Sequence, residues 1–171
     1  GDSKWITGEE ARTYAHRLRK QHDAVLVGIG TVLEDDPELT TRLVRGKNPV
    51  RVVLDSSLKI SLMAAVLNPL ADTIIFTGLD SDIVKAEALA ALPNVEVVRL
   101  PLADGVLPVA QVVQALAERG ITSLLVEGGS AIHGAFFDAG LADRVCAFVA
   151  PKLIGGAAAL PPVGGAGSRS R

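Results

Sequence analysis

The stretch Leu124-Leu125-Val126-Glu127-Gly128-Gly129-Ser130-Ala131-Ile132-His133-Gly134-Ala135-Phe136-Phe137 decides the fold of this chain. Its first residues form an apolar run that predicts a buried strand, and two glycines then let the backbone turn sharply. Ser130 can cap a following helix, whose first amides lack intrahelical partners and carry partial positive charge. A strand, a glycine turn and a helix in this order can hold a nucleotide pyrophosphate on the backbone of residues 129–132, with Glu127 at the end of the strand beside it. An ordinary turn between strand and helix explains the pattern equally well.

The composition indicates one folded domain. The chain has 171 residues, 49% of them apolar, with a mean hydropathy of +0.35. Its apolar runs are too short to cross a membrane. Seventeen Lys and Arg against 19 Asp and Glu give a net charge of −2 without long charge runs, which excludes electrostatic attraction of nucleic acid. Three scattered histidines and one cysteine contain no metal-ligand spacing, so we expect no metal site and a buried thiol at Cys146.

Strands and helices alternate along the chain. Apolar runs predict strands over residues 23–28, 50–55, 73–77, 95–100, 121–127 and 143–150. Helices are predicted over residues 7–21, 82–92, 108–120 and 130–139, the first with a capping box that starts at Thr7, and a short turn or helix runs up to Asp36. Continuous apolar strands separated by helices predict an α/β domain of three layers with a mainly parallel sheet. The Gly- and Ser-rich end from residue 157 is predicted to be mobile or interrupted.

Other polar groups lie where the predicted strands end. Gly28-Ile29-Gly30-Thr31-Val32-Leu33 begins like a dinucleotide fingerprint, but Leu33 replaces its third glycine, so a Rossmann site is rejected. A tight turn and a phosphate site remain equally compatible with these glycines. The segment 54–59 offers two serines and a lysine to a phosphate, although ordinary turns have the same composition. Arg19 and Arg42 suit a phosphorylated substrate only if they converge. Residue type and spacing give no role to the histidines at 16, 22 and 133.

Four ordered motifs resemble the reductase domain of bacterial bifunctional riboflavin-biosynthesis deaminase/reductases. They are Ser3-Lys4-Trp5-Ile6-Thr7-Gly8-Glu9-Glu10-Ala11-Arg12, the segment 23–33 with Asp35-Asp36-Pro37, Val126-Glu127-Gly128-Gly129, and Ala150-Pro151-Lys152-Leu153-Ile154-Gly155-Gly156. The resemblance covers residues 3 to about 165 and implies a single reductase domain over residues 1–171 with a dihydrofolate-reductase-like fold. It also implies a cytoplasmic homodimer that uses NADPH to reduce 5-amino-6-(5-phosphoribosylamino)uracil, opening its ribose to a ribityl chain.

The resemblance further implies the residues of the site. Positions that match NADP-binding positions of the family are Trp5, Thr31, Asp35, Ser56, Gly129, Ser130, Ala131, Ile132, His133, Gly134 and Ala135. Positions that match substrate-binding positions are Ser3, Arg19, Leu39, Arg42 and Glu127. Ser56 fits contact with the 2′-phosphate of the cofactor, which favours NADPH over NADH. We hypothesise that Glu127 orients the ribose or relays a proton to its ring oxygen.

The sequence departs from the family pattern toward both ends. The family has a strand before the position of Ser3, with a lysine that faces the pocket, and further strands after the position of Gly156. The 171 residues contain neither, so we expect exposed sheet edges. The zinc-deaminase signatures H-x-E and P-C-x-x-C are also absent from them. Two alternatives therefore stay open: a non-catalytic relative that binds nucleotide or assembles with a partner, and a reductase of a pteridine or another phosphoribosyl pyrimidine.

Overall fold

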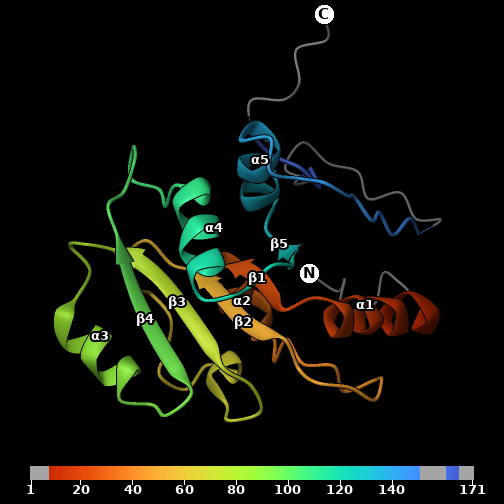
Figure 1. Ribbon diagram of the computed structural model, residues 1–171, viewed down its shortest axis with the longest axis horizontal. Helices are drawn as coiled ribbons and strands as arrows, with labels where there is room; N and C mark the ends of the chain where they lie inside the picture. The colour runs from red at the N-terminus through yellow and green to blue at the C-terminus, as the bar shows by residue number, and fades with distance from the viewer. Residues whose placement is uncertain (1–7, 151–160, 166–171) are drawn as a thin grey trace, which may run out of the picture.

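A sheet of five parallel strands lies at the centre of the molecule (Figure 1). The computed structural model describes residues 8–150 and 161–165. The order of strands across the sheet is β4-β3-β2-β1-β5, and every neighbouring pair is parallel. The strands are β1 (Ala24–Gly28), β2 (Val50–Leu54), β3 (Thr73–Gly78), β4 (Val95–Leu100) and β5 (Leu124–Gly128). Five of the six predicted strands are thereby confirmed.

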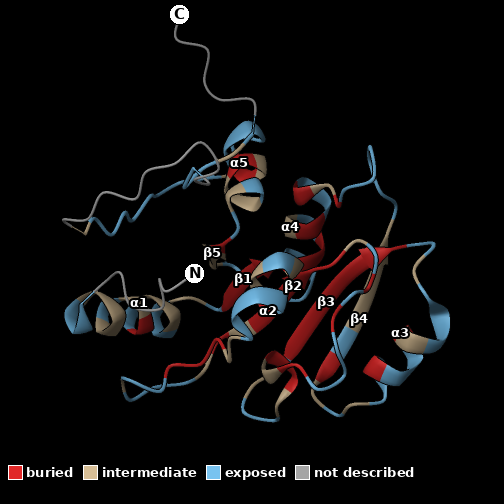
Figure 2. Ribbon diagram, turned by 180° about the vertical axis from the view of Figure 1, so that it is seen from behind, coloured by how far each residue is buried: buried red, intermediate tan, exposed pale blue. Residues whose placement is uncertain are grey.

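Helices cover both faces of this sheet, as Figures 1 and 2 show from opposite sides. Helices α2 and α3 pack with one buried cluster, which includes Val25, Val53 and Leu89. Helices α4 and α5 pack with a second cluster on the other face, which includes Leu26 and Phe76. The three-layer α/β prediction is confirmed. The helices are α1 (Glu9–Gln21), α2 (Ile29–Asp35), α3 (Ile83–Ala90), α4 (Val109–Glu118) and α5 (Ser130–Asp138), with a short 3-10 helix, η1 (Ala65–Leu67).

Burial differs between the middle and the edges of the sheet. All residues of β1 and β3 are buried, as is all of β2 except Val50, because helices cover both faces of these strands. Most of β5 is only half-buried, although its apolar sequence predicts a buried strand. Among the described residues β5 pairs with β1 alone, so it is an edge strand of this sheet. Helix α1 lies beyond that edge, and α3 and β4 lie at the opposite side of the molecule (Figure 1).

The sixth predicted strand, over residues 143–150, does not form. These residues have no regular secondary structure, and Val149 is 90% exposed. Cys146 is exposed as well, so the prediction of a buried thiol is wrong. A strand needs a neighbour to receive its backbone hydrogen bonds, and the described residues offer this segment none. The ring of Phe148 instead meets Tyr14 of α1 edge-on, with centroids 6.0 Å apart.

Two predicted helix caps also differ from the structure. Gly8 is the N-cap of α1, one position after the predicted cap, and Thr7, where the predicted capping box starts, lies outside the described residues. Gly129 is the N-cap of α5, and Ser130 is its first helical residue rather than its cap. No described side chain caps α5. Its first backbone N–H groups are therefore left for another partner.

Asp23 joins the starts of β1 and β5. Its Oδ2 accepts hydrogen bonds from the backbone and hydroxyl of Thr122 at 2.9 and 2.8 Å, and from those of Ser123 at 2.9 and 2.9 Å. These bonds, with the Thr122 hydroxyl first, lower the pKa of Asp23 to about 2. The carboxylate thus fixes the register of β5 against β1 from the end of the sheet opposite to Glu127.

The variant Asp23→Asn tests this connection. Because the folded-state pKa of Asp23, about 2, lies below its ordinary value of 3.8, the carboxylate stabilises the fold above pH 3.8 and loses that effect as the pH falls through 2. We expect Asp23→Asn to lower the Tm at pH 7 and to lose part of the decline in Tm between pH 3.8 and pH 2. Thermal unfolding across this range measures both effects. The control is Asp104→Asn, the same substitution at an exposed turn residue between β4 and α4. If the Tm of Asp23→Asn fell with pH as steeply as that of the wild type, the Asp23 carboxylate would not stabilise the fold in this way.

Candidate active site

The strand order changes direction at β1, and the predicted site lies there. The chain leaves β1 through α2 on one face of the sheet, and leaves the neighbouring β5 through α5 on the other face. The first turns of α2 and α5 therefore diverge at the carboxyl ends of two adjacent parallel strands. Ligands of open α/β sheets bind at such a point.

Glycines allow the backbone to pack closely at this point. A Cβ atom on Gly28 would lie 3.0 Å from Cγ1 of Ile132, and one on Gly128 would lie 2.7 Å from Oγ1 of Thr31. Gly129 has a φ of 87°, a conformation that other residues adopt only with strain. Gly28 and Gly128 are thus buried against the side chains of Ile132 and Thr31, and Gly129 is exposed at the start of α5.

A register shift between β1 and β5 reorients Glu127. Leu26 pairs with Val126, but the next residue of β1, Val27, pairs with Gly128, so Glu127 has no partner in β1. An extra residue of this kind is a β-bulge, which bends the strand and redirects a side chain. The bulge turns Glu127 toward α1, where its carboxylate meets Arg19.

Arg19 and Glu127 form a bidentate ion pair. Nε of Arg19 donates to Oε1 of Glu127 and Nη2 donates to Oε2, both at 2.6 Å. Nη1 of Arg19 also donates to the carbonyl oxygen of Thr40 at 3.0 Å. The two charged side chains are 13% and 19% exposed, so water screens this pair less than a surface pair. The pair joins α1, the segment after α2 and the end of β5.

His16 lies beside this pair, although no role is predicted for it from residue type and spacing. It is the only buried residue of α1, 5% exposed, and its Nδ1 has no hydrogen-bond partner among the described residues. Burial lowers the pKa of His16, and the charges of Arg19 and Arg42 lower it further, against smaller opposite effects of Glu127 and the Thr40 backbone. The imidazole is therefore neutral at neutral pH. Its spacing of three residues from Arg19 was the one signal in the sequence, because such residues share a helix face.

The segment between α2 and β2 carries the other predicted substrate residues. Leu39 is 2% exposed and has a φ of 54°, and Asp36 has a φ of 40°. Residues other than glycine adopt this backbone conformation at a cost of about 1 kcal/mol or more, and such residues concentrate at functional sites. Leu39 precedes Thr40, which contacts Arg19. Arg42 is exposed, lies 3.5 Å from Glu38 and acts on His16 through its charge.

The predicted cofactor residues of α5 occupy different surroundings. Gly129 and Ala131 are exposed and Ser130 is half-buried at the start of the helix, where the unpaired amides lie. Ile132 and Ala135 instead pack against the second core cluster. The remaining two face the described residues 161–165. The ring of His133 is 3.0 Å from the carbonyl oxygen of Pro162, and a Cβ on Gly134 would lie 2.4 Å from the Gly164 backbone.

The other predicted cofactor residues come from three separate segments. Thr31 lies in the first turn of α2 beside Gly128. Ser56 is half-buried in the turn that follows β2, and its carbonyl oxygen accepts a hydrogen bond from Gly78 at 3.0 Å. Asp35 is exposed at the last residue of α2. Ser3 and Trp5 lie outside the described residues.

Metal ligand clusters and membrane-spanning helices are both absent from the described residues. No group of three or more His, Cys, Asp and Glu side chains there is placed to hold a metal ion. No helix within residues 8–150 and 161–165 is long and apolar enough to cross a membrane.

Comparison with known proteins gives consistent results. The profile of the RibD C-terminal domain family matches residues 1–171. The riboflavin biosynthesis protein RibD of Bacillus amyloliquefaciens is 45% identical over 99% of this chain and 46% of its own length. The 2,5-diamino-6-ribosylamino-4(3H)-pyrimidinone 5′-phosphate reductase of Methanothermobacter thermautotrophicus is 37% identical over 96% of this chain and 76% of its own length.

A solved structure agrees with these sequence matches. The deaminase/5-amino-6-(5-phosphoribosylamino)uracil reductase of Thermotoga maritima aligns with a TM-score of 0.66 and 41% identity, over 81% of this chain and 36% of that one. The likeness confirms the dihydrofolate-reductase-like fold predicted from the sequence. The chain spans less than half the length of the first bacterial RibD relatives it matches.

A double-mutant cycle tests the ion pair between Arg19 and Glu127. Arg19→Met or Glu127→Gln each leaves one partly buried group without its partner, which we expect to lower the free energy of unfolding by about 1 to 3 kcal/mol. The double variant is expected to lose less than the sum, giving a coupling energy above about 1 kcal/mol in urea unfolding. The control pair is Arg119 and Glu96, which has the same 2.6 Å separation but more exposed side chains. Its coupling energy should stay below about 0.5 kcal/mol. Additive effects at Arg19 and Glu127 would show that the pair does not form in solution.

Proposed function

Because the chain belongs to the RibD C-terminal domain family, we propose that it is an NADPH-dependent reductase of riboflavin biosynthesis. Its proposed substrate is 5-amino-6-(5-phosphoribosylamino)uracil, whose ribose is opened to a ribityl chain. The observation that carries the proposal is the place of the Arg19–Glu127 pair beside the uncapped start of α5. The ion pair suits the phosphorylated sugar of the substrate, and the start of α5 suits the dinucleotide cofactor.

The free hydrogen-bonding capacity of the pair supports its role in holding the substrate. A guanidinium has five N–H groups, and Arg19 uses one on each nitrogen, so one remains on each terminal nitrogen for a phosphate or hydroxyl. Each oxygen of Glu127 keeps a lone pair that can accept a hydrogen bond from a ribose hydroxyl. Of the two roles hypothesised for Glu127, this arrangement favours orienting the ribose over relaying a proton, because a carboxylate held by a guanidinium is already fixed as an acceptor.

The start of α5 fits the proposed cofactor. The amides of Ser130, Ala131 and Ile132 precede the first intrahelical bond, which runs from His133 N to Gly129 O at 3.0 Å. These donors, together with the helix dipole, suit a pyrophosphate. When bound, the nicotinamide supplies the hydride. Ser56, with the exposed Lys59 three residues later, would hold the 2′-phosphate that distinguishes NADPH from NADH.

We extend the proposal to assembly and location. The exposed apolar side chains of Val145, Phe148 and Val149 support a homodimer, because exposed apolar side chains grouped in one segment commonly meet a partner. The cytoplasmic location implied by the resemblance stays a prediction.

Two alanine variants at opposite ends of α5 test the cofactor half of the site. Gly129→Ala introduces a side chain at a φ of 87°, and Gly140→Ala does so at a φ of 65° beyond the other end of the helix. Both should lower the Tm through similar backbone strain. Only Gly129→Ala should weaken NADPH binding, by roughly tenfold, because it displaces the amides proposed to hold the pyrophosphate. Titration with NADPH and NADH, followed by nicotinamide fluorescence, measures this. Equal loss of NADPH affinity in both variants would show that the start of α5 does not bind the cofactor.

The activity itself is tested by turnover of the purified protein. With 5-amino-6-(5-phosphoribosylamino)uracil, we expect the absorbance of NADPH at 340 nm to fall as NADPH is oxidised. The product should be heavier than the substrate by two hydrogens. Glu127→Gln keeps the shape of the side chain but removes its charge, so it should reduce kcat/KM by about 10²-fold while binding of NADPH stays within about twofold. No turnover by folded wild-type protein that binds NADPH would overturn the proposed substrate, and full turnover by Glu127→Gln would overturn the role of Glu127.

A further inference from the structure

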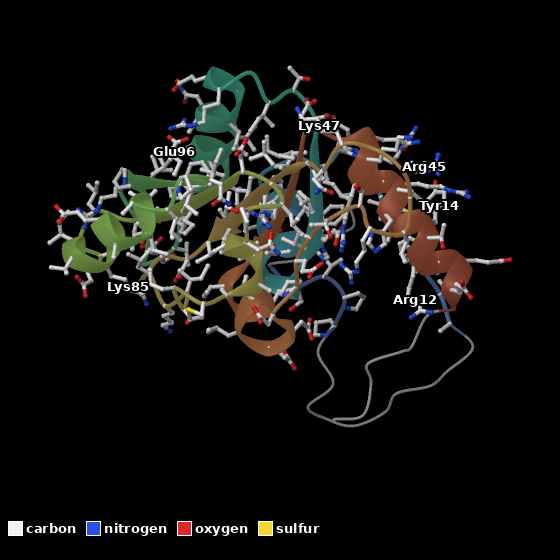
Figure 3. The ribbon with its side chains drawn as sticks, turned by 90° about the horizontal axis from the view of Figure 1, so that it is seen from below. Arg12, Tyr14, Arg45, Lys47, Lys85 and Glu96 are labelled. Atoms are coloured by element: carbon white, nitrogen blue, oxygen red, sulfur yellow. The ribbon has the colours of Figure 1, made fainter. Side chains whose placement is uncertain are left out.

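His16 anchors α1 to the rest of the molecule. Every other residue of this 13-residue helix is half-buried or exposed, and His16 alone is buried. Figure 3 shows two residues of the same helix, Arg12 and Tyr14, projecting at the side of the molecule away from Lys85 and Glu96. His16 is therefore the side chain of α1 that is most enclosed by the rest of the molecule, beside the contacts that Arg19 and Tyr14 make from the same helix.

Packing alone does not account for an imidazole at this place. Its Nδ1 is buried without a hydrogen-bond partner among the described residues, which costs free energy that a leucine of similar size would not cost. The ring must therefore offer something that an apolar side chain lacks. A neutral imidazole has one donor and one acceptor nitrogen. The backbone of Thr40 faces the ring.

Thr40 connects His16 to the candidate site. Its carbonyl oxygen accepts the hydrogen bond from Nη1 of Arg19 at 3.0 Å. His16 and Arg19 are one helical turn apart on the same face of α1, so both side chains reach the Thr40 segment together. Arg19 in turn holds both oxygens of Glu127. His16 thus lies near Thr40, Arg19 and Glu127, and Arg19 is bonded to the other two.

The charges around the ring are consistent with this connection. Arg19 faces it from α1, Arg42 from the segment after α2, and Glu127 from β5. A permanently charged lysine or arginine at position 16 would repel both arginines. A neutral imidazole keeps a polar contact without adding a third positive charge between them.

We infer that His16 is a positioning residue for the substrate half of the site, which fixes α1 and the Thr40 segment so that Arg19 presents Glu127 to the sugar. The inference rests on the proposed function for its consequence in catalysis. Its structural consequence, that His16 keeps the Arg19 guanidinium in one position, does not depend on the proposed function.

The direct test is the rate at which the Arg19 Nε–H proton exchanges with water, measured by NMR and assigned by its loss in Arg19→Lys. We expect His16→Leu to speed this exchange roughly tenfold, because the guanidinium loses its fixed partners more often. His16→Gln keeps a donor and an acceptor and should stay within about threefold of the wild type. The matched control is His22→Gln, a histidine at the end of the same helix whose ring contacts the Leu18 carbonyl at 2.7 Å, and it should leave the exchange unchanged. His16→Met replaces His16→Leu if the Tm shows that the latter does not fold.

Kinetics then separate positioning from general destabilisation. His16→Leu should raise the KM for the phosphoribosyl substrate roughly tenfold and leave the Kd for NADPH within about twofold, with His16→Gln restoring most of the loss. Unchanged Arg19 exchange in folded His16→Leu, or equal weakening of substrate and NADPH, would overturn the inference. If the wild type does not turn over the substrate, the proposed function fails, and the exchange rates alone decide the role of His16.

Discussion

The ion pair between Arg19 and Glu127 is the interaction on which the candidate site depends. It joins α1, the Thr40 segment and the edge strand β5. The bulge leaves Glu127 without a partner in β1, and a bulge redirects the side chain of such an extra residue. The fork geometry of the ion pair fixes both the distance and the plane of the carboxylate. The position of the Glu127 carboxylate therefore depends on both β5, which carries the residue, and α1, which carries Arg19.

The same few residues also separate the two halves of the site. Glu127 belongs to the side facing α1, whereas Gly129 begins the turn into α5 on the other face of the sheet. Gly128 lies between them against Thr31, where no larger residue fits. A substrate held by Glu127 and a cofactor held by the first amides of α5 would thus be set by adjacent backbone atoms. Because so few residues separate the two sites, the substrate and the cofactor would be held in the fixed alignment that hydride transfer requires.

The sequence predicts most of the fold because its strands are continuous apolar runs and because recognisable residues precede its helices, Asp82 before α3 and Pro108 before α4. The same rules fail at residues 143–150, since an apolar run indicates only the capacity to form a strand, and pairing depends on a neighbour. Glu127 was found because it ends a strand before two glycines. The bulge was not predicted, because it arises from the pairing of β1 with β5, which lie far apart in the sequence. The burial of His16 was not predicted either, because Thr40, Arg42 and Glu127 come close to α1 only in the folded chain.

The most direct test of this account is a crystal structure of the protein with NADP⁺ and ribose 5-phosphate, the sugar part of the proposed substrate. We expect the pyrophosphate on the amides of residues 129–132 and the sugar beside Arg19 and Glu127, with the bidentate contact between these two side chains intact. Binding of either ligand at another edge of the sheet, or a sugar that contacts neither Arg19 nor Glu127, would contradict it.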